Sequence, residues 1–73
     1  MTAAQFRLVV IRILRGVGSH RLHSYEIARE ITRTTQLTQD EASDMLFDLI
    51  DAIVNATPRD RILSFQHGYV IAT

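Results

Sequence analysis

A chain of 73 residues, 47% of them hydrophobic, has room for one domain with a modest core. It contains no cysteine, which excludes a disulfide framework and a thiolate metal site. The formal net charge is zero, yet residues 1–36 carry six arginines against two glutamates and residues 37–73 carry two arginines against six acidic residues. Such asymmetry bears on partners rather than on fold.

The first four residues lack the basic segment and long apolar run of a secretory signal. The longest apolar run, residues 8–11, is far short of the ~20 residues that span a bilayer. We therefore expect a cytoplasmic protein that does not contact membranes.

The first predicted helix runs from about Ala3 to Leu14 and ends at Gly16 and Gly18. Apolar residues at helical spacing predict its core-facing side: Phe6, Val9, Val10, Ile13 and Val17. The other side carries Leu8, Ile11, Arg12 and Arg15.

Residues 19–23 leave room for one short extended piece before a second helix, which is predicted to begin near Ser24, a favourable N-cap residue. Its buried stripe is predicted to be Ile27, Ala28 and Ile31. Threonines at positions 32, 34 and 35 weaken helix propensity, so we expect the chain to turn there.

The third predicted helix begins at Thr38, which forms a capping-box pattern with Glu41. Helical spacing then continues through Ala42, Met45, Leu46, Leu49, Ile50 and Ile53. Residues 55–58 end the helix, because Pro58 disfavours helical geometry at Thr57.

Two β-prone runs, Arg61–Phe65 and Tyr69–Ala72, flank Gly68, which can adopt positive φ, and they predict a tight terminal hairpin. The order helix, short extended piece, helix, helix, hairpin is that of a winged helix, with a helix-turn-helix and a wing. We therefore expect one α+β domain over residues 1–73, mostly helical, with three helices and a C-terminal β-hairpin.

Several segments resemble the OmpR/PhoB-type winged-helix effector domains, and together they span nearly the whole chain. They are Phe6-Arg7-Leu8 with Ile13-Leu14, the run His20-Arg21-Leu22-His23-Ser24, the apolar spacing of residues 44–53, and Pro58 and Ile62 with Gly68-Tyr69-Val70-Ile71. Most of these matches are apolar positions that any winged helix shares. The resemblance implies the winged-helix fold.

The chain also departs from that family. The N-terminal sheet is missing, and both the loop before the third helix and the wing are shorter. Where the family has basic and polar residues on the exposed face of the third helix, this chain has Phe47, Asp48, Asp51 and Ala52. The DNA-reading residues of the family therefore cannot be carried over.

From Ser24 onward the chain also resembles the start of the HU/IHF histone-like fold. The matching positions are Leu37-Thr38, Ala42, Leu46, Asp51-Ala52-Ile53 and Gly68. The basic arms that grip DNA in that family are missing, and the first 20 residues have no counterpart. The winged helix is therefore the preferred interpretation.

The third helix has an acidic exposed side, and no Lys or Arg occurs from Gln36 to Thr57 to pair with it. Like charges one turn apart, such as Asp44 and Asp48, destabilise a helix by about 0.2–0.5 kcal/mol per pair. This side is either merely solvated or binds a basic protein partner, and it is not expected to enter a DNA groove, since phosphates would be repelled. Its candidate binding residues are Asp44, Asp48 and Asp51, with Phe47 as the apolar anchor.

Two further surfaces are candidates. The first helix combines apolar and basic residues, as interfaces do: Arg7, Leu8, Ile11, Arg12 and Arg15. Alternatively, Leu8 and Ile11 are covered by the hairpin or by a second copy, or the arginines contact phosphates. The wing residues His67, Gly68 and Tyr69 either reach a DNA backbone or form a plain turn with Tyr69 packed on the core.

No glycine-rich phosphate loop, nucleophile elbow or HExxH motif occurs. His20, His23, His67 and Asp60 do not have the spacing of a convincing metal site. We therefore expect a non-catalytic protein without a cofactor, a metal or a small-molecule substrate.

Two main classes of function remain. The preferred one is a transcription regulator that binds a protein, similar in kind to small phage proteins that inhibit or modify host bacterial RNA polymerase. The other is a DNA-binding winged-helix transcription factor that uses the Arg-rich first helix and the wing. An HU-like nucleoid protein without arms is a further alternative.

Overall fold

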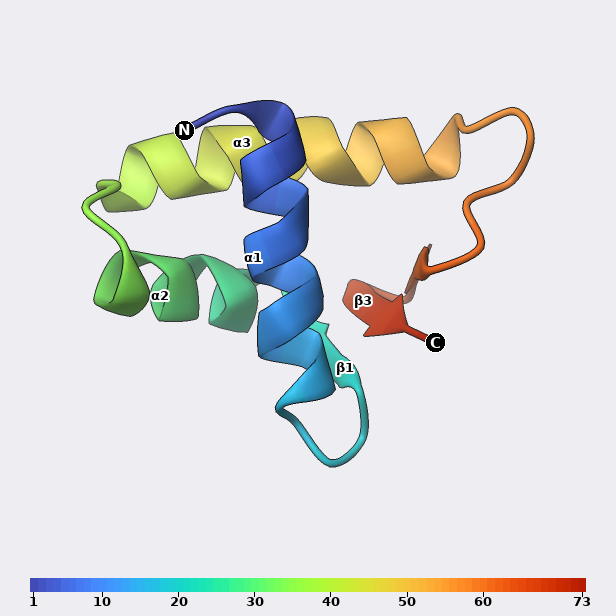
Figure 1. Cartoon of the computed structure of the whole chain (residues 1–73), viewed down its shortest axis with the longest axis horizontal. Coiled ribbons are helices and arrows are strands. Elements are labelled where there is room, and N and C mark those ends of the chain that lie inside the picture. Colours follow the sequence, from blue (N-terminus) through green and yellow to red (C-terminus); the bar gives the residue numbers. More distant parts are fainter.

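The computed structural model describes residues 1–73 and contains three helices and one three-stranded antiparallel sheet (Figure 1). In chain order the elements are α1 (Ala3–Arg15), β1 (Arg21–His23), α2 (Ser24–Thr34), α3 (Gln39–Val54), β2 (Leu63–Gln66) and β3 (Tyr69–Ala72). The predicted α+β class and the predicted order of the elements are therefore confirmed. No helix is both long enough and apolar enough to cross a membrane.

Side-chain caps set where the helices begin. The predicted capping box of α3 is confirmed, because the Glu41 N–H donates to Thr38 Oγ1 at 3.2 Å and the Thr38 N–H donates to Glu41 Oε1 at 3.0 Å. The prediction of Ser24 as the N-cap of α2 is wrong, since the cap is His23. The Ser24 N–H donates to the Gly68 carbonyl at 3.0 Å, so β1 runs directly into α2 and the cap falls one residue earlier.

The strands lie in the order β1-β3-β2, so β3 is central and pairs with both neighbours. The hairpin register runs from Leu63↔Ala72 to Gln66↔Tyr69, and His67 and Gly68 occupy the turn with positive φ of 53° and 82°. This confirms the tight hairpin predicted from Gly68. The short extended piece before α2 becomes β1, which pairs with the other edge of β3.

The core contains 13 buried residues, all hydrophobic, and α1 contributes Phe6, Val10, Ile11 and Leu14. The predicted stripes of α2 and α3 are largely correct, since Ile27, Ala28 and Ile31 are buried, as are Ala42, Leu46 and Ile53. On α1 the prediction is partly wrong: Phe6 and Val10 are buried and Val9 and Ile13 pack against the core, but Ile11, which was predicted on the other side, is buried as well. The buried side of α1 is rotated toward Ile11, because α1 packs against β3 as well as against α2 and α3.

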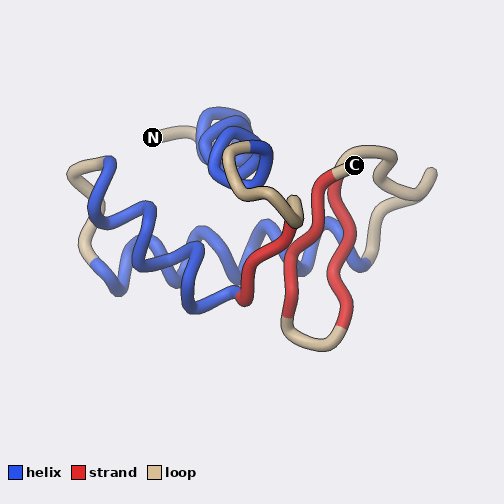
Figure 2. The backbone as a smooth tube through the Cα atoms, turned by 90° about the horizontal axis from the view of Figure 1, so that it is seen from below, coloured by secondary structure: helices blue, strands red, loops and turns tan.

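Helix α1 crosses α3 and passes close to the N-terminal end of α2 (Figure 1). The turn of the β2–β3 hairpin points away from α1, to the opposite side of the molecule (Figure 2). The molecule therefore has an α1 side and, opposite it, a side toward which the hairpin turn extends.

Candidate protein-binding surface

The outward side of α3 exposes two large apolar side chains, Phe47 and Val54, which are 73% and 62% exposed. They lie seven residues apart, which places them on one side of the helix, two turns from each other. Met45 and Leu49, on the opposite side of α3, line a shared cavity with Phe6 of α1. The outward side of α3 therefore faces away from α1.

Aspartates surround these two apolar side chains. Asp40, Asp44, Asp48 and Asp51 are all exposed, and none of them forms an ion pair. The one side-chain hydrogen bond among them is donated by Asn55 Nδ2 to Asp51 Oδ1 at 3.0 Å. We call the surface formed by Asp40, Asp44, Phe47, Asp51 and Val54 the outer face of α3. Asp48 lies at its border, where it also lines the cavity shared with α1.

Glu41, by contrast, is used by the fold. The Thr38 N–H and hydroxyl form hydrogen bonds with its carboxylate and lower the pKa of Glu41 below its ordinary value. A carboxylate is also favourable in the first turn of a helix. The acidic residues beyond this first turn have no such role, so the charge of the outer face is not needed to build α3.

A mostly apolar groove of about 250 Å³ lies along the surface between α2 and α3, beside the outer face. Its lining includes Ala28, Leu46 and Ile50, with Tyr25 on the α2 side and Phe47 on the α3 side. Tyr25 is 59% exposed, and our sequence reasoning did not single it out. The available signal was its position two residues before Ile27, which places it outside the buried stripe of α2.

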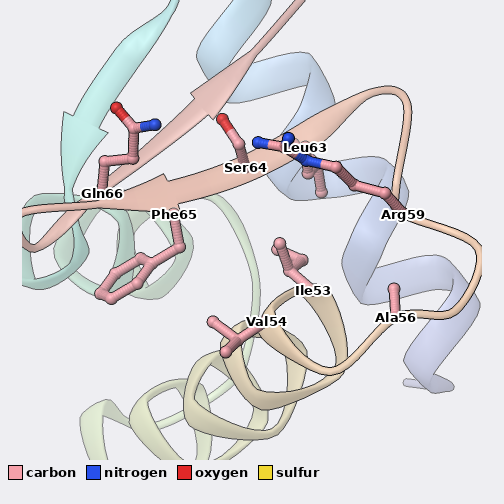
Figure 3. A pocket seen from close by; sticks show the side chains of 8 residues that line it. All are labelled: Ile53, Val54, Ala56, Arg59, Leu63, Ser64, Phe65 and Gln66. Atoms are coloured by element: carbon pink, nitrogen blue, oxygen red, sulfur yellow. The ribbon is translucent and has the colours of Figure 1, made fainter.

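A second hollow, of about 410 Å³, lies where the C-terminal end of α3 meets β2 (Figure 3). The side chains of Val54 and Phe65 point into the space between the helix and the strand, and Arg59 is the one charged residue of the lining. Val54 was also missed by sequence reasoning. Concave, partly apolar spaces thus adjoin the outer face of α3 near both Phe47 and Val54.

The predicted basic surface of α1 is smaller than expected. Ile11 is 6% exposed and belongs to the core, so its assignment to a binding surface is wrong; α1 packs against β3 on this side. Arg7 is also not free, because its guanidinium forms a bidentate ion pair with Asp60 at 2.7 and 3.1 Å. Leu8, 53% exposed, remains with the exposed Arg12 and Arg15.

Asp60 receives four hydrogen bonds and joins the segment before β2 to α1. Besides the two from Arg7, its carboxylate accepts the N–H groups of Ile62 and Leu63 at 2.9 and 2.8 Å. The Arg7 guanidinium, followed by the Leu63 N–H, holds the pKa of Asp60 well below its ordinary value of 3.8. This carboxylate is therefore part of the structural framework.

The hairpin turn presents one exposed residue, His67, beside the half-buried Gly68. Tyr69 is half-buried, with the Arg21 guanidinium 5.0 Å from its ring centre and the His23 ring packed against it in a T-shaped arrangement, 5.4 Å between the ring centres. The turn points away from α1, so the predicted wing and helix α1 lie on different sides of the molecule (Figure 2).

The structure brings no three His, Asp or Glu side chains close enough to hold a metal ion, and His23 instead packs between Tyr25 and Tyr69. Comparison with protein-family models, curated proteins and solved structures finds no significant match for this chain.

Proposed function

We propose that this chain is a winged-helix protein that binds another protein through the outer face of α3 and acts as a small, non-catalytic transcription regulator. Its target would be bacterial RNA polymerase, in the cytoplasm of a bacterium or of a phage-infected cell. The observation that carries the proposal is the exposed pair Phe47 and Val54 among aspartates that have no ion-pair partner.

The arrangement of elements supports the winged-helix part of the proposal. The element order and the strand order β1-β3-β2 are those expected of a winged helix, in which α2 and α3 would form the helix-turn-helix and the β2–β3 hairpin the wing. An HU-like fold gives no role to the first 20 residues, whereas Phe6, Val10 and Leu14 are fully buried here. Helix α1 is thus integral to the core, which favours the winged helix.

The charge of α3 supports a protein target rather than DNA. A helix that enters a DNA groove gains affinity by neutralising phosphates. The outer face of α3 would instead bring Asp40, Asp44 and Asp51 against them. Exposed aromatic and apolar side chains beside unpaired charges are typical of protein interfaces, where they bury apolar area and select a partner of opposite charge.

The test is direct binding of the purified protein to bacterial RNA polymerase, measured by biolayer interferometry. Phe47→Ala and Asp51→Arg are expected to weaken binding tenfold or more, about 1.4 kcal/mol each. Arg12→Glu on the α1 side is the matched control and should bind as the unmodified protein does. Absence of polymerase binding, or unchanged binding by both α3 variants, would overturn the proposal.

DNA binding through α1 and the wing is the second candidate, favoured by Arg12 and Arg15, which are exposed and free of ion pairs. The separation of α1 from the hairpin turn in Figure 2 weakens it, since one duplex would have to reach two sides of the molecule. A gel-shift series across salt concentrations separates the two candidates. Tight binding with a steep salt dependence that is lost in Arg12→Glu would favour DNA.

A further inference from the structure

The lining of the α2–α3 groove is mostly apolar, with one aromatic residue on each side, and its polar members are Ser24, Gln39 and Ser43. Ala28 and Leu46 are buried, and Tyr25 and Phe47 rise on the two sides with more than half of each side chain's surface in water. Such apolar surface gains about 25 cal/mol for each Å² that a partner removes from water. An apolar side chain of a partner that enters the groove would therefore be held between these two exposed aromatic rings.

The backbone around the groove restricts what can lie in it. Both walls are helices, whose N–H and C=O groups beyond the first and last turns are bonded within each helix. The N-terminus of α2 at the groove is capped, because the Tyr25 N–H donates to His23 Nδ1 and the His23 N–H donates to Glu26. An extended peptide would find no strand edge to pair with here, whereas a helix satisfies its own backbone hydrogen bonds, which favours a helix in the groove.

The charge on the α3 side of the groove, where the aspartates lie, indicates the sign of the partner. Asp40, Asp44 and Asp51 share the outer face with Phe47, and no Lys or Arg of α3 offsets them. Arginine or lysine side chains at helical spacing along a partner helix would meet these carboxylates from the flank of the groove. Complementary charge of this kind selects the partner and speeds association.

We propose that the α2–α3 groove seats the apolar stripe of a cationic amphipathic helix of the partner protein, with basic side chains against the aspartates of α3. This inference rests on the proposed function, because it uses the same face, and it adds the secondary structure and charge of the segment that is bound.

The probe is a synthetic peptide of about 18 residues, long enough to form a helix, with leucine at helical spacing and arginine on both flanks of the stripe. Binding to the ¹⁵N-labelled protein is followed by amide shift changes and by fluorescence anisotropy. Shift changes are expected at residues 24–28 and 43–50. Tyr25→Ala and Phe47→Ala should each weaken binding about tenfold, whereas Leu8→Ala, which removes an exposed apolar side chain from α1, should not.

A peptide of the same composition with its leucines scattered is the control for nonspecific charge attraction. The inference is overturned if this control binds equally well, if the shifts fall on α1 or the hairpin, or if duplex DNA or a second copy of the chain produces the same shifts. Polymerase binding that depends on Phe47 without peptide shifts in the groove would leave the proposed function standing and remove this inference. Peptide binding in the groove without polymerase binding would support the groove as a site for a cationic helix and remove the proposed polymerase target.

Discussion

Helices α1 and α3 carry charges of opposite sign and use them differently. On α1, Arg7 is drawn into the structure by Asp60, and this pair anchors the segment before β2. On α3, Asp40, Asp44, Asp48 and Asp51 have no ion-pair partner. A charge of α1 thus contributes to the fold, whereas the aspartates of α3 can be changed without loss of a native ion pair.

The apolar residues of the two helices also differ, in how deeply they are buried. Both Ile11 and Phe47 fall outside the simplest helical stripe of their sequences, yet Ile11 is buried and Phe47 is the most exposed of the large hydrophobic residues. The difference arises because the sheet packs on that side of α1 while no element covers the outer face of α3. Substitutions on α1 and on α3 should therefore change the free energy of unfolding by different amounts.

The largest effect is expected in the core. Ile11→Ala should lower the free energy of unfolding by about 2–5 kcal/mol, since it removes buried methyl groups and leaves a cavity. Phe47→Ala should change it by no more than about 0.5 kcal/mol, because the ring is exposed. Urea unfolding followed by circular dichroism measures both, and equal losses for the two variants would contradict the comparison.

The next effect concerns the ion pair. Asp60→Asn should cost about 1.5–3 kcal/mol, because hydrogen bonds to a charged group are lost and the Arg7 guanidinium is left without its partner. Asp51→Asn on α3 is the matched control and should be nearly neutral, as Asp51 faces solvent. Equal losses of stability in both variants would contradict the statement that the Arg7–Asp60 pair supports the fold whereas Asp51 does not.

A pH series should show a smaller effect from the same carboxylate. The pKa of Asp60 is lower in the folded chain than in the unfolded chain, mainly because of Arg7. The stabilisation that the Asp60 carboxylate gives the fold is therefore complete above the pKa that Asp60 has in the unfolded chain. It is lost progressively as the pH falls below about 5 toward the pKa that Asp60 has in the folded chain. The difference in unfolding free energy between the unmodified protein and Asp60→Asn should shrink between pH 7 and pH 3; a constant difference would assign the effect to packing.

The smallest expected change in the free energy of unfolding is a gain rather than a loss. Asp44→Asn or Asp48→Asn should raise the free energy of unfolding by about 0.2–0.5 kcal/mol, because the repulsion one turn apart on α3 is relieved. The gain should diminish at high salt, where exposed charges are screened. Thermal unfolding at low and high salt would measure it, and a loss of stability would mean that these aspartates have a structural role.

Sequence reasoning recovered the features that depend on neighbours along the chain. The Thr38–Glu41 capping box, the turn at Gly68 and the acidic exposed side of α3 follow from spacing and residue type alone. Within the candidate site, Asp44, Phe47 and Asp51 were found in this way. Tyr25 and Val54 were missed, because their importance comes from the groove and hollow that they border.

The tertiary structure decided everything that depends on which elements meet. Asp60 reaches Arg7 across 53 positions, and no local pattern predicts that pair. The pairing of β1 with β3 makes His23 the cap of α2, and the packing of α1 on β3 buries Ile11. A sequence determines helix spacing, caps and turns through local geometry, but the side of a helix that is buried is chosen by the elements that pack against it.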